Sequence, residues 1–394
     1  MERAELVELL TPEGLTLLDE VAGEDPGDVV ATVSRLRAAG HSPSLVASVL
    51  TQAKLRAKAQ GKFGAFAARM LFTEAGLEQA TRLRVAALHA GRFDSAGLTR
   101  VADLGCGIGG DAMALAALDL EVTAVDVDEV TATVASYNLA PFESARVEHA
   151  SAEDIDLDRF DALYFDPARR TAGHSNTARL TQPSDYTPSL DFVFAAAAAR
   201  PTGVKLGPGF DRSLIPDDAE AQWVSVDGHV VELGLWFGAV AREGIHRSAL
   251  VLDSNGSHEL HAGADSEDVD VAPLGEYLWE PDGAVIRARL IGDVARTLGA
   301  GMLSDGIAYL TGDEARTTPF ATGFRILERF PLDERSLKRE LRARGIGTLE
   351  VKKRGADIDP AAFRARMNLK GPKSATLVLT RVAGRHAALL CERL

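Results

Sequence analysis

A glycine-rich segment, DLGCGIGG, constrains the fold of this chain more than any other feature. The apolar residues before it, Thr99–Leu104, predict a strand, and Gly110–Ala117 after it predict a helix. Its glycines Gly105, Gly107 and Gly109 let the backbone turn sharply and let a ligand approach main-chain N–H groups without a Cβ in the way. A strand, a glycine loop and a helix in this order predict a Rossmann-like nucleotide-binding unit.

Alternating strand and helix patterns continue beyond the glycine loop and predict the fold class. Short apolar runs are separated by helical segments, as expected for an α/β protein with a doubly wound, mainly parallel sheet. A predicted hairpin turns at Asp227-Gly228 near the end of this Rossmann-like domain, and Ala249–Leu252 is a further candidate strand. The further predicted strands are Glu121–Asp126, Arg146–His149, Ala162–Phe165, Gly203–Leu206, Gln222–Val226 and Val230–Phe237.

The segments on either side of this domain differ from it in pattern and charge. Apolar residues before about Arg92 recur at spacings of three and four, which predicts an α-helical N-terminal domain. The segment 324–394 carries 17 Lys and Arg against 8 Asp and Glu, although the formal net charge of the whole chain is -14. This segment therefore differs in the sign of its charge from the rest of the chain. The predicted parts are the α-helical domain 1–92, the Rossmann-like domain 93–255, a connecting region 256–323 and a small basic α/β module 324–394.

Composition excludes several classes of protein. The two cysteines, Cys106 and Cys391, cannot build a disulfide framework or a Cys-based zinc site, and we expect no bound metal. Cys106 is interpreted as a small residue that fills the loop, not as a nucleophile. No stretch reaches the roughly 18 apolar residues needed to cross a bilayer, so we expect no membrane partner and a cytoplasmic location.

Two carboxylates favour one ligand for the glycine loop among several. The spacing G-x-G-x-x-G also occurs in proteins that bind NAD or FAD. However, Asp103, two residues before the first glycine, would repel a pyrophosphate and suits the α-ammonium group of a methionine moiety. Asp126, at the end of the second predicted strand, can accept hydrogen bonds from both ribose hydroxyls, with Asp128 as the second candidate for this role. The pattern predicts S-adenosylmethionine as the cofactor.

A second motif, FDPARR, ends the fourth predicted strand, at the edge where doubly wound folds hold their substrates. Asp166 and Pro167 are the predicted catalytic residues, because this carboxylate can lie beside the cofactor sulfonium and orient or deprotonate an acceptor. Arg169 and Arg170 can clamp a phosphate or carboxylate of the substrate. Alternatively, the two arginines pair with nearby acids such as Asp161 or Asp185 and only fix the loop.

These motifs, with the upstream LFTEAGLEQATRLRVAALHAGRF, the later EYLWEPDGAVIRA and the basic C-terminus, resemble a bacterial group of class I S-adenosylmethionine-dependent methyltransferases that end in a THUMP-like domain. The resemblance extends from about Lys62 to the end of the chain. It implies that Ser151 and Ala152, after the third strand, lie against the adenine ring. Related methyltransferases of nucleobase amines carry a second proline and an aromatic residue where this chain has Ala168 and Arg169, so aromatic stacking at that position is not available.

The resemblance also implies a substrate class, because THUMP domains of related enzymes bind RNA. We therefore predict a methyltransferase that acts on an RNA base, in tRNA or rRNA, and holds the RNA through its basic C-terminal module. The alternatives are a methyltransferase with a small-molecule or protein acceptor and a non-catalytic RNA-binding protein that binds the cofactor. The predicted RNA-binding residues of the module are Lys352, Lys353, Arg354, Lys370 and Lys373.

Overall fold

The structure, a computed structural model, describes residues 2–22, 29–169 and 185–394. The chain divides into two compact units. The first comprises Met1–Leu206 with Leu235–Arg242, and the second comprises Gly207–Gly234 with Glu243–Leu394. The bounds of the four parts given above remain predictions.

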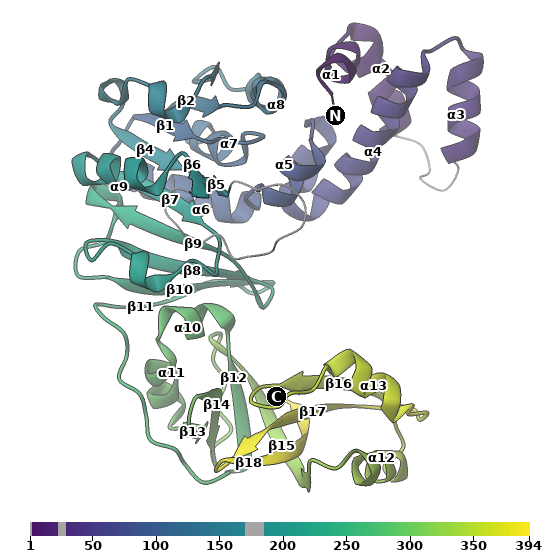
Figure 1. Cartoon of the computed structure of the whole chain (residues 1–394), viewed down its shortest axis with the longest axis vertical. Coiled ribbons are helices and arrows are strands. Elements are labelled where there is room, and N and C mark those ends of the chain that lie inside the picture. Colours follow the sequence, from purple (N-terminus) through teal and green to yellow (C-terminus); the bar gives the residue numbers. More distant parts are fainter. Residues whose placement is uncertain (1, 23–28, 170–184) are drawn as a thin grey trace. The chain divides into compact units, whose positions relative to one another are not determined.

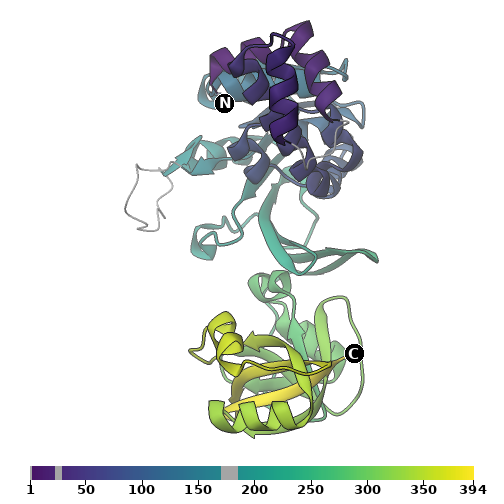
Figure 2. The same cartoon turned by 90° about the vertical axis from the view of Figure 1, so that its right-hand side faces the viewer.

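Four helices form the N-terminal end of the first unit, as the spacing of apolar residues predicted (Figures 1 and 2). The longest of them begins where Ser42 accepts a hydrogen bond from Leu45 N at 3.0 Å, with Pro43 in the first turn. A serine cap followed by proline suits a helix start, because the side chain satisfies one free N–H and proline lacks another. The helices are α1 (Arg3–Leu9), α2 (Pro12–Ala22), α3 (Val29–Ala38) and α4 (Pro43–Phe63).

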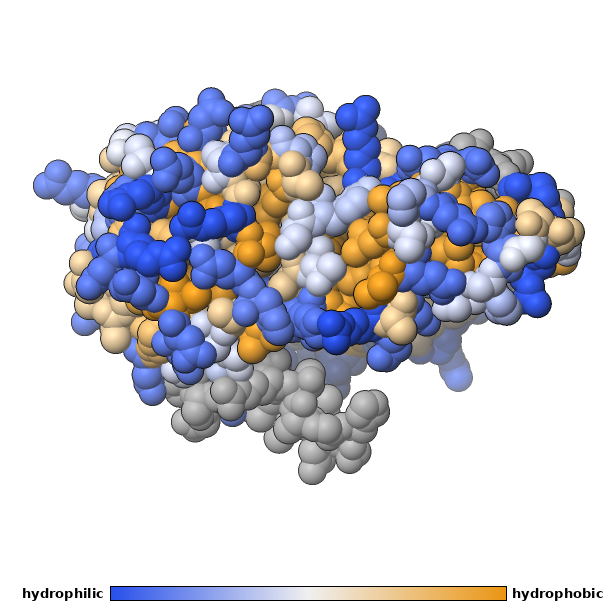
Figure 3. All heavy atoms as spheres, turned by 90° about the horizontal axis from the view of Figure 1, so that it is seen from above, coloured by the Kyte–Doolittle hydropathy of each residue, from blue (hydrophilic) through white to orange (hydrophobic). Residues whose placement is uncertain are grey.

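The helices bury one apolar face and leave some apolar residues at the surface. Leu9 and Leu18 are completely buried, whereas Val7 is 61% and Val30 is 78% exposed. Seen from above, hydrophobic residues are visible at several places between hydrophilic side chains (Figure 3). Single exposed apolar residues are ordinary on protein surfaces, so these residues do not indicate a binding site.

An extended, buried segment links the helices to the sheet, and two side-chain amides satisfy its backbone. Gln52 accepts a hydrogen bond from Phe72 N at 3.0 Å and donates to Phe72 O at 2.7 Å. Asn138 bonds to Leu71 N and O in the same way and also donates to Ile108 O in the glycine loop at 2.9 Å. Because buried backbone groups need partners, these amides fix the segment against the loop. The elements that flank it are η1 (Gly64–Arg69), α5 (Glu74–Gln79) and α6 (Leu83–Ser95).

A nine-stranded, mainly parallel sheet confirms the predicted fold class (Figure 1). Strand β1 pairs in parallel with β2 on one side and with β4 on the other, so the strand order reverses at this point. Doubly wound sheets bind ligands where the order reverses. The order is β11-β10-β8-β9-β7-β4-β1-β2-β3. These strands are β1 (Arg100–Leu104), β2 (Glu121–Asp126), β3 (Ala145–His149), β4 (Ala162–Phe165), β7 (Thr202–Leu206), β8 (Glu220–Val226), β9 (His229–Phe237), β10 (Arg247–Asp253) and β11 (Gly256–Ala262).

Short helices and tight turns connect the strands. The turn at Asp227-Gly228 between β8 and β9 has φ values of 51° and 78°, and two positive values are the requirement of the hairpin turn that the sequence predicted. The two-residue strands β5 (Ala168–Arg169) and β6 (Tyr186–Thr187) form a separate ribbon after β4. The helices are α7 (Gly110–Ala116), α8 (Glu129–Leu139) and α9 (Leu190–Ala199), with short 3-10 turns η2 (Ala152–Asp154), η3 (Leu157–Arg159), η5 (Arg212–Leu214) and η6 (Gly238–Val240).

The second unit contains a seven-stranded sheet of order β13-β14-β12-β15-β18-β17-β16. Residues 256–323, for which the sequence suggested only a connection, supply three of these strands and two helices. The strands are β12 (Tyr277–Pro281), β13 (Gly301–Ser304), β14 (Ile307–Gly312), β15 (Ala321–Pro331), β16 (Ile346–Lys353), β17 (Lys373–Val382) and β18 (Arg385–Arg393). The helices are α10 (Gly283–Ala288), α11 (Ile291–Leu298), α12 (Glu334–Ala343) and α13 (Pro360–Met367).

Both faces of this second sheet are buried at its centre. In β17, Leu377 and Leu379 pack with helices α12 and α13, whereas the intervening Val378 packs with β12 and β14 on the opposite face. Such alternation follows from the two-residue period of a strand. Phe363 on α13 is fully buried in this core, so it is not available to stack on a nucleic acid base.

Candidate active site

The glycine loop turns directly after β1 and lies against the residue that follows β4. Gly105, Gly107 and Gly109 have φ values of 89°, 56° and 86°, which residues with a Cβ rarely adopt. A Cβ at Gly105 would lie 2.9 Å from the carbonyl oxygen of Asp166. The loop and the FDPARR motif therefore adjoin at the point where the strand order reverses.

Asp103 is a buried carboxylate without a hydrogen-bond partner. It is 1% exposed, and neither of its carboxylate oxygens is hydrogen-bonded within the described part of the chain. Burial raises the pKa of Asp103 well above its usual range, and the charges of Asp111 and Asp166 raise it further. A buried unpaired acid is costly unless a cation or donor compensates it. This carboxylate and the Cβ-free loop fit a ligand with an ammonium group.

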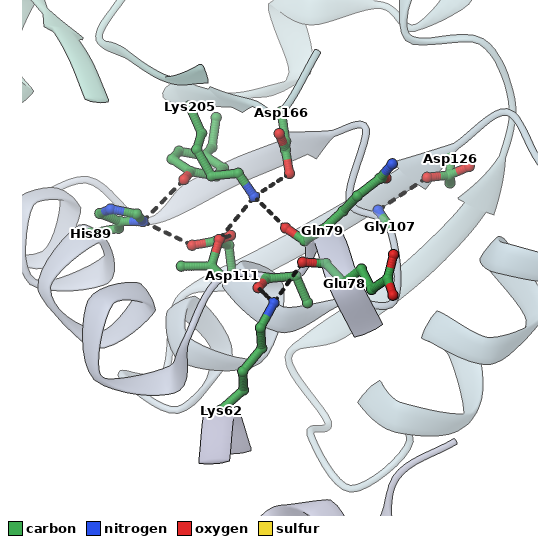
Figure 4. Close-up of polar contacts among 12 residues, drawn as sticks. Lys62, Glu78, Gln79, His89, Gly107, Asp111, Asp126, Asp166 and Lys205 are labelled. Atoms are coloured by element: carbon green, nitrogen blue, oxygen red, sulfur yellow. Dashed lines mark hydrogen bonds and ion pairs between the residues drawn. The ribbon is translucent and has the colours of Figure 1, made fainter. Parts of the chain in front are cut away.

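Asp126 lies at the end of β2, beside the same loop (Figure 4). It accepts hydrogen bonds from Gly107 N at 3.0 Å and from Asp128 N at 2.9 Å. Burial raises the pKa of Asp126, although these backbone hydrogen bonds oppose the shift. The second candidate, Asp128, instead caps α8 and accepts hydrogen bonds from the backbone and hydroxyl of Thr131 at 2.8 and 2.7 Å. Of the two acids, Asp126 has the position suited to a ribose.

Ser151 and Ala152 follow β3 at the same edge of the sheet, because β1, β2 and β3 are parallel. Ser151 caps the short turn η2 and accepts a weak hydrogen bond from Glu153 N at 3.4 Å. Ala152 is buried, with 7% of its surface exposed. The structure thus brings all the predicted cofactor-binding residues to the carboxyl edge of four neighbouring strands.

Asp166 is joined to a lysine that the sequence motifs did not include. Lys205 Nζ lies 2.5 Å from Asp166 Oδ2 and also donates to Thr81 Oγ1 at 3.0 Å and Gln79 O at 3.3 Å (Figure 4). The Lys205 side chain is only 11% exposed. A hydrogen-bonded ion pair of this kind holds the Asp166 carboxylate in one orientation. Pro167, the other predicted catalytic residue, is buried.

The polar network continues from Thr81 into the interior. Thr81 Oγ1 donates to Asp111 Oδ2 at 2.6 Å, and His89 Nδ1 lies 2.9 Å from Asp111 Oδ1 and 3.0 Å from the hydroxyl of Tyr164 (Figure 4). Burial raises the pKa of Asp111, but its hydrogen bond and ion pair with His89 outweigh this, and the net shift is downward. Asp111 is therefore ionised and compensated, unlike Asp103. A charge inside the apolar strand Thr202–Leu206 was the sequence signal for this network.

Lys62, at the end of α4, holds the segment that closes one side of the site. Its ammonium group donates to the carbonyl oxygens of Leu77, Glu78 and Ala80 at 2.8, 2.7 and 2.7 Å (Figure 4). Burial, together with neighbouring positive charges, lowers the pKa of Lys62 to about 8. These bonds satisfy carbonyls at the C-terminal end of α5, which lack partners within the helix.

The two predicted substrate arginines are only partly described. Arg169 belongs to β5, which pairs with β6, whereas Arg170 lies outside the described residues. Asp161, suggested above as a partner of these arginines, instead binds Arg100 at 2.6 Å. Asp161 thus has another partner, which weakens the alternative that Arg169 and Arg170 pair with nearby acids and only fix the loop.

The predicted RNA-binding residues of the second unit fall into two groups. Lys352 Nζ lies 2.6 Å and Arg354 Nη2 lies 3.5 Å from the carboxylate of Glu280 on β12. Much of the charge of this pair is thus neutralised within the protein. The exposed members of the set are Lys353, Lys370 and Lys373.

Three further observations concern the Cys106 thiol, metal binding and membrane-spanning helices. Burial raises the pKa of the Cys106 thiol well above its usual range, so this residue is a neutral thiol. Within residues 2–22, 29–169 and 185–394, no group of three or more His, Cys, Asp or Glu side chains is arranged to hold a metal ion. In the same part of the chain, no helix is long and apolar enough to cross a bilayer.

Comparison with known proteins adds independent findings. A family model described as "THUMP domain-like" matches residues 321–393, and a model for a domain of unknown function matches residues 2–59. The chain is 35% identical over 365 residues to an uncharacterised S-adenosylmethionine-dependent methyltransferase of Mycobacterium tuberculosis, found in strains CDC 1551 and H37Rv. The match covers 88% of this chain and 95% of the relative.

A solved structure is similar to this chain over its whole length. It is a protein of Porphyromonas gingivalis W83 described as a "putative methyltransferase", with a TM-score of 0.73 and 20% sequence identity. The match covers 100% of this chain and 98% of that chain, which shows a common fold.

Proposed function

The chain belongs to the S-adenosylmethionine-dependent methyltransferases, and from this premise we propose that its methyl acceptor is a base in tRNA or rRNA. The predicted family, the class of enzyme and the cofactor are confirmed by the relatives, and the THUMP-like module by the family model. The acceptor and the roles of individual residues are the proposal.

The observation that supports an RNA acceptor is the nature of the C-terminal segment. Residues 321–393 match a THUMP-like model, and the segment 324–394 carries 17 basic against 8 acidic residues in an otherwise acidic chain. Local positive charge is what an RNA-binding surface requires, because phosphate neutralisation dominates affinity for nucleic acids. Lys353, Lys370 and Lys373 are the exposed lysines of the predicted set and are proposed to contact phosphates.

The cofactor supplies a methyl group on a sulfonium, which is already a good electrophile, so the protein has mainly to bind and align the reactants. We assign Asp103 to the cationic amino group, because it is the buried acid without a partner. Asp126 is assigned to the ribose hydroxyls, and Ser151 and Ala152 to the adenine. The absence of a Cβ at Gly105 lets the glycine loop pack against the backbone of Asp166, which brings the two motifs together.

Asp166 and Pro167 are proposed to position the acceptor at the end of β4. Lys205 is proposed to keep the Asp166 carboxylate ionised and oriented, because its ammonium group lies 2.5 Å from Oδ2. Arg169 and Arg170 are proposed to contact a phosphate of the acceptor. A carboxylate already paired with a lysine is a weak base, so its role here is chiefly to orient the acceptor.

The test is mass spectrometry of nucleosides from tRNA and rRNA of a deletion strain and its parent. We expect one methylated nucleoside to be missing in the deletion strain and to return with the wild-type chain but not with Asp166→Ala. Asp128→Asn, which changes an acid near the site but keeps its helix cap, is the matched control and should restore the nucleoside. An unchanged set of nucleosides in the deletion strain would contradict an RNA acceptor.

A further inference from the structure

A compact group of arginines lies in the second unit, outside the segment where the sequence predicted RNA binding. Arg212 Nη2 and Arg247 Nε lie 2.7 and 2.8 Å from Asp265 Oδ1, and Arg289 Nε lies 3.7 Å from Asp265 Oδ2. We propose that these three arginines, the arginine cluster, bind a phosphodiester group of the RNA acceptor. The inference rests on the function proposed above and adds a binding site to it.

Three separate elements bring the arginines together. Arg212 begins the turn η5, Arg247 begins β10, and Arg289 follows α10. Arg289 has a φ of 60°, a left-handed conformation that is unfavourable for a residue with a side chain. Its carbonyl oxygen accepts hydrogen bonds from both the N–H and the hydroxyl of Ser266, each at 2.9 Å. The fold therefore holds Arg289 next to Asp265 against a local backbone preference.

The cluster has more positive charge and more hydrogen-bond donors than its single acid can use. Arg212 and Arg247 donate to the same oxygen of Asp265, and the 3.7 Å separation from Arg289 is too long for a hydrogen bond. Arg212 Nε is buried and has no hydrogen-bond partner among the described residues. A guanidinium group offers five N–H donors, and a phosphate is the ligand whose oxygens match several such groups at once.

The acid at the centre of the cluster does not cancel its charge. Burial raises the pKa of Asp265, but hydrogen bonds from Arg247 and Arg212 outweigh this and lower it. Asp265 is thus ionised at neutral pH, and three positive charges surround one negative charge. An excess of positive charge on a chain with a net charge of -14 attracts a polyanion locally.

The cluster is also accessible. The side chains of Arg212, Arg247 and Arg289 are 30%, 25% and 64% exposed. The guanidinium of Arg212 lies 5.6 Å from the ring centroid of the buried Trp223, which limits the freedom of this side chain. Partly ordered, partly exposed arginines are suited to phosphate contacts, because less side-chain entropy is lost on binding.

The experiment measures binding of the full chain to fluorescently labelled bulk tRNA over a series of salt concentrations. The variants Arg289→Gln and Arg247→Gln should each weaken binding and make the slope of log K against log salt shallower by roughly 0.7 to 0.9, the value expected for one lost phosphate contact. Asp265→Asn should strengthen binding and steepen the slope, an effect that damage to the fold cannot imitate. Arg316→Gln is the matched control, because Arg316 is a 46% exposed arginine of the same unit paired with Glu314.

The outcomes separate this inference from the proposed function. If all cluster variants bind tRNA with the affinity and the salt slope of the wild type, the arginine cluster is not an RNA-binding site. The proposal of an RNA acceptor would still stand in that case. If the cluster variants change the binding of inorganic phosphate but not that of tRNA, the proposed role of the cluster in RNA binding is wrong as well. Absence of tRNA binding by the wild type at low salt would overturn both. Thermal unfolding of each variant checks that a weaker binder is still folded; if Arg289→Gln unfolds early, the direction of the Asp265→Asn effect decides alone.

Discussion

The replacement Asp103→Asn should have opposite effects on the stability of the free protein and on its affinity for the cofactor. The carboxylate of Asp103 is 1% exposed and has no hydrogen-bond partner within the described residues. Leaving a buried polar group unsatisfied costs about 1–3 kcal/mol, and more when the group is charged. Asparagine has the same shape and a polar amide but no charge, so at pH 8 we expect the free variant to be more stable, by about 1.4 kcal/mol for each pH unit by which folding raises the pKa of Asp103.

The pH dependence of the free energy of unfolding tests the sign of this effect a second time. Because burial raises the pKa of Asp103 in the folded chain, the folded state binds this proton more tightly than the unfolded state. The contribution of Asp103 to the free energy of unfolding therefore falls as the pH rises from about 4, the unfolded value, towards the folded pKa, by about 1.4 kcal/mol per pH unit. The gain in Asp103→Asn should be small near pH 4 and should grow as the pH rises.

Binding of the cofactor should change in the other direction. Removing one partner of a buried ion pair costs about 3–5 kcal/mol, so calorimetry should show S-adenosylmethionine binding at least about 100-fold more weakly to Asp103→Asn. Asp128→Asn is the matched control, because Asp128 caps α8 and asparagine caps helices equally well. A variant that binds the cofactor like the wild type, or that is less stable without it, would refute the assignment of Asp103 to the ammonium group.

Three further replacements test the rest of the site. Gly105→Ala should abolish detectable cofactor binding in calorimetry, because its Cβ would lie 2.9 Å from the carbonyl oxygen of Asp166 at a φ of 89°; binding within threefold of the wild type would contradict this. Lys205→Met should lower the rate of RNA methylation about 100-fold while Lys205→Arg retains part of it, because the 2.5 Å ion pair orients Asp166 and a misplaced group costs about this factor in rate; equal rates in the two variants would argue against a positioning role. Asn138→Ala should lower the free energy of unfolding in urea by about 2–4 kcal/mol, because its amide satisfies three buried backbone groups; a loss under about 1 kcal/mol would show that water replaces the amide.

The fold of the first unit was predictable because its signals are local. Strands β2 and β4 have the predicted bounds, Glu121–Asp126 and Ala162–Phe165, since short apolar runs between helical segments leave little choice. The glycine loop and the hairpin turn at Asp227-Gly228 require backbone conformations that few residue types adopt. Each of these features is decided within a few residues, so one sequence is sufficient.

Residues 256–323 could not be assigned in the same way. Their strands β12, β13 and β14 pair within a sheet that also contains β15 and the later strands β16–β18. Strand β12, for example, pairs with β15 through Leu278 and Phe324, which are far apart in the chain. Pairing of this kind depends on long-range packing, and the local pattern of a short strand does not specify it.

The polar partners of the site were missed for a related reason. Lys205 meets Thr81, and His89 meets Asp111, across separations of 124 and 22 residues. The charge count did not reveal a pairing of Lys352 and Arg354, because their acid, Glu280, lies outside the basic segment in which the two residues were counted. A sequence shows how much charge a segment carries, whereas pairing decides how much of it remains for a ligand.

Pairing explains why only one acid of the site is left for a cationic cofactor. Four carboxylates lie around the end of β1, and each of three has its compensation within the protein. The charge partners are Lys205 for Asp166 and His89 for Asp111, while Asp126 receives two backbone N–H groups. Asp103 is buried and receives no hydrogen bond from the described residues. If its negative charge served only the fold, a neutral residue would be less costly. The acid without a hydrogen bond is thus Asp103, the residue that its position before the glycine loop had assigned to the ammonium group. Without the cofactor, this buried acid lowers the stability of the protein.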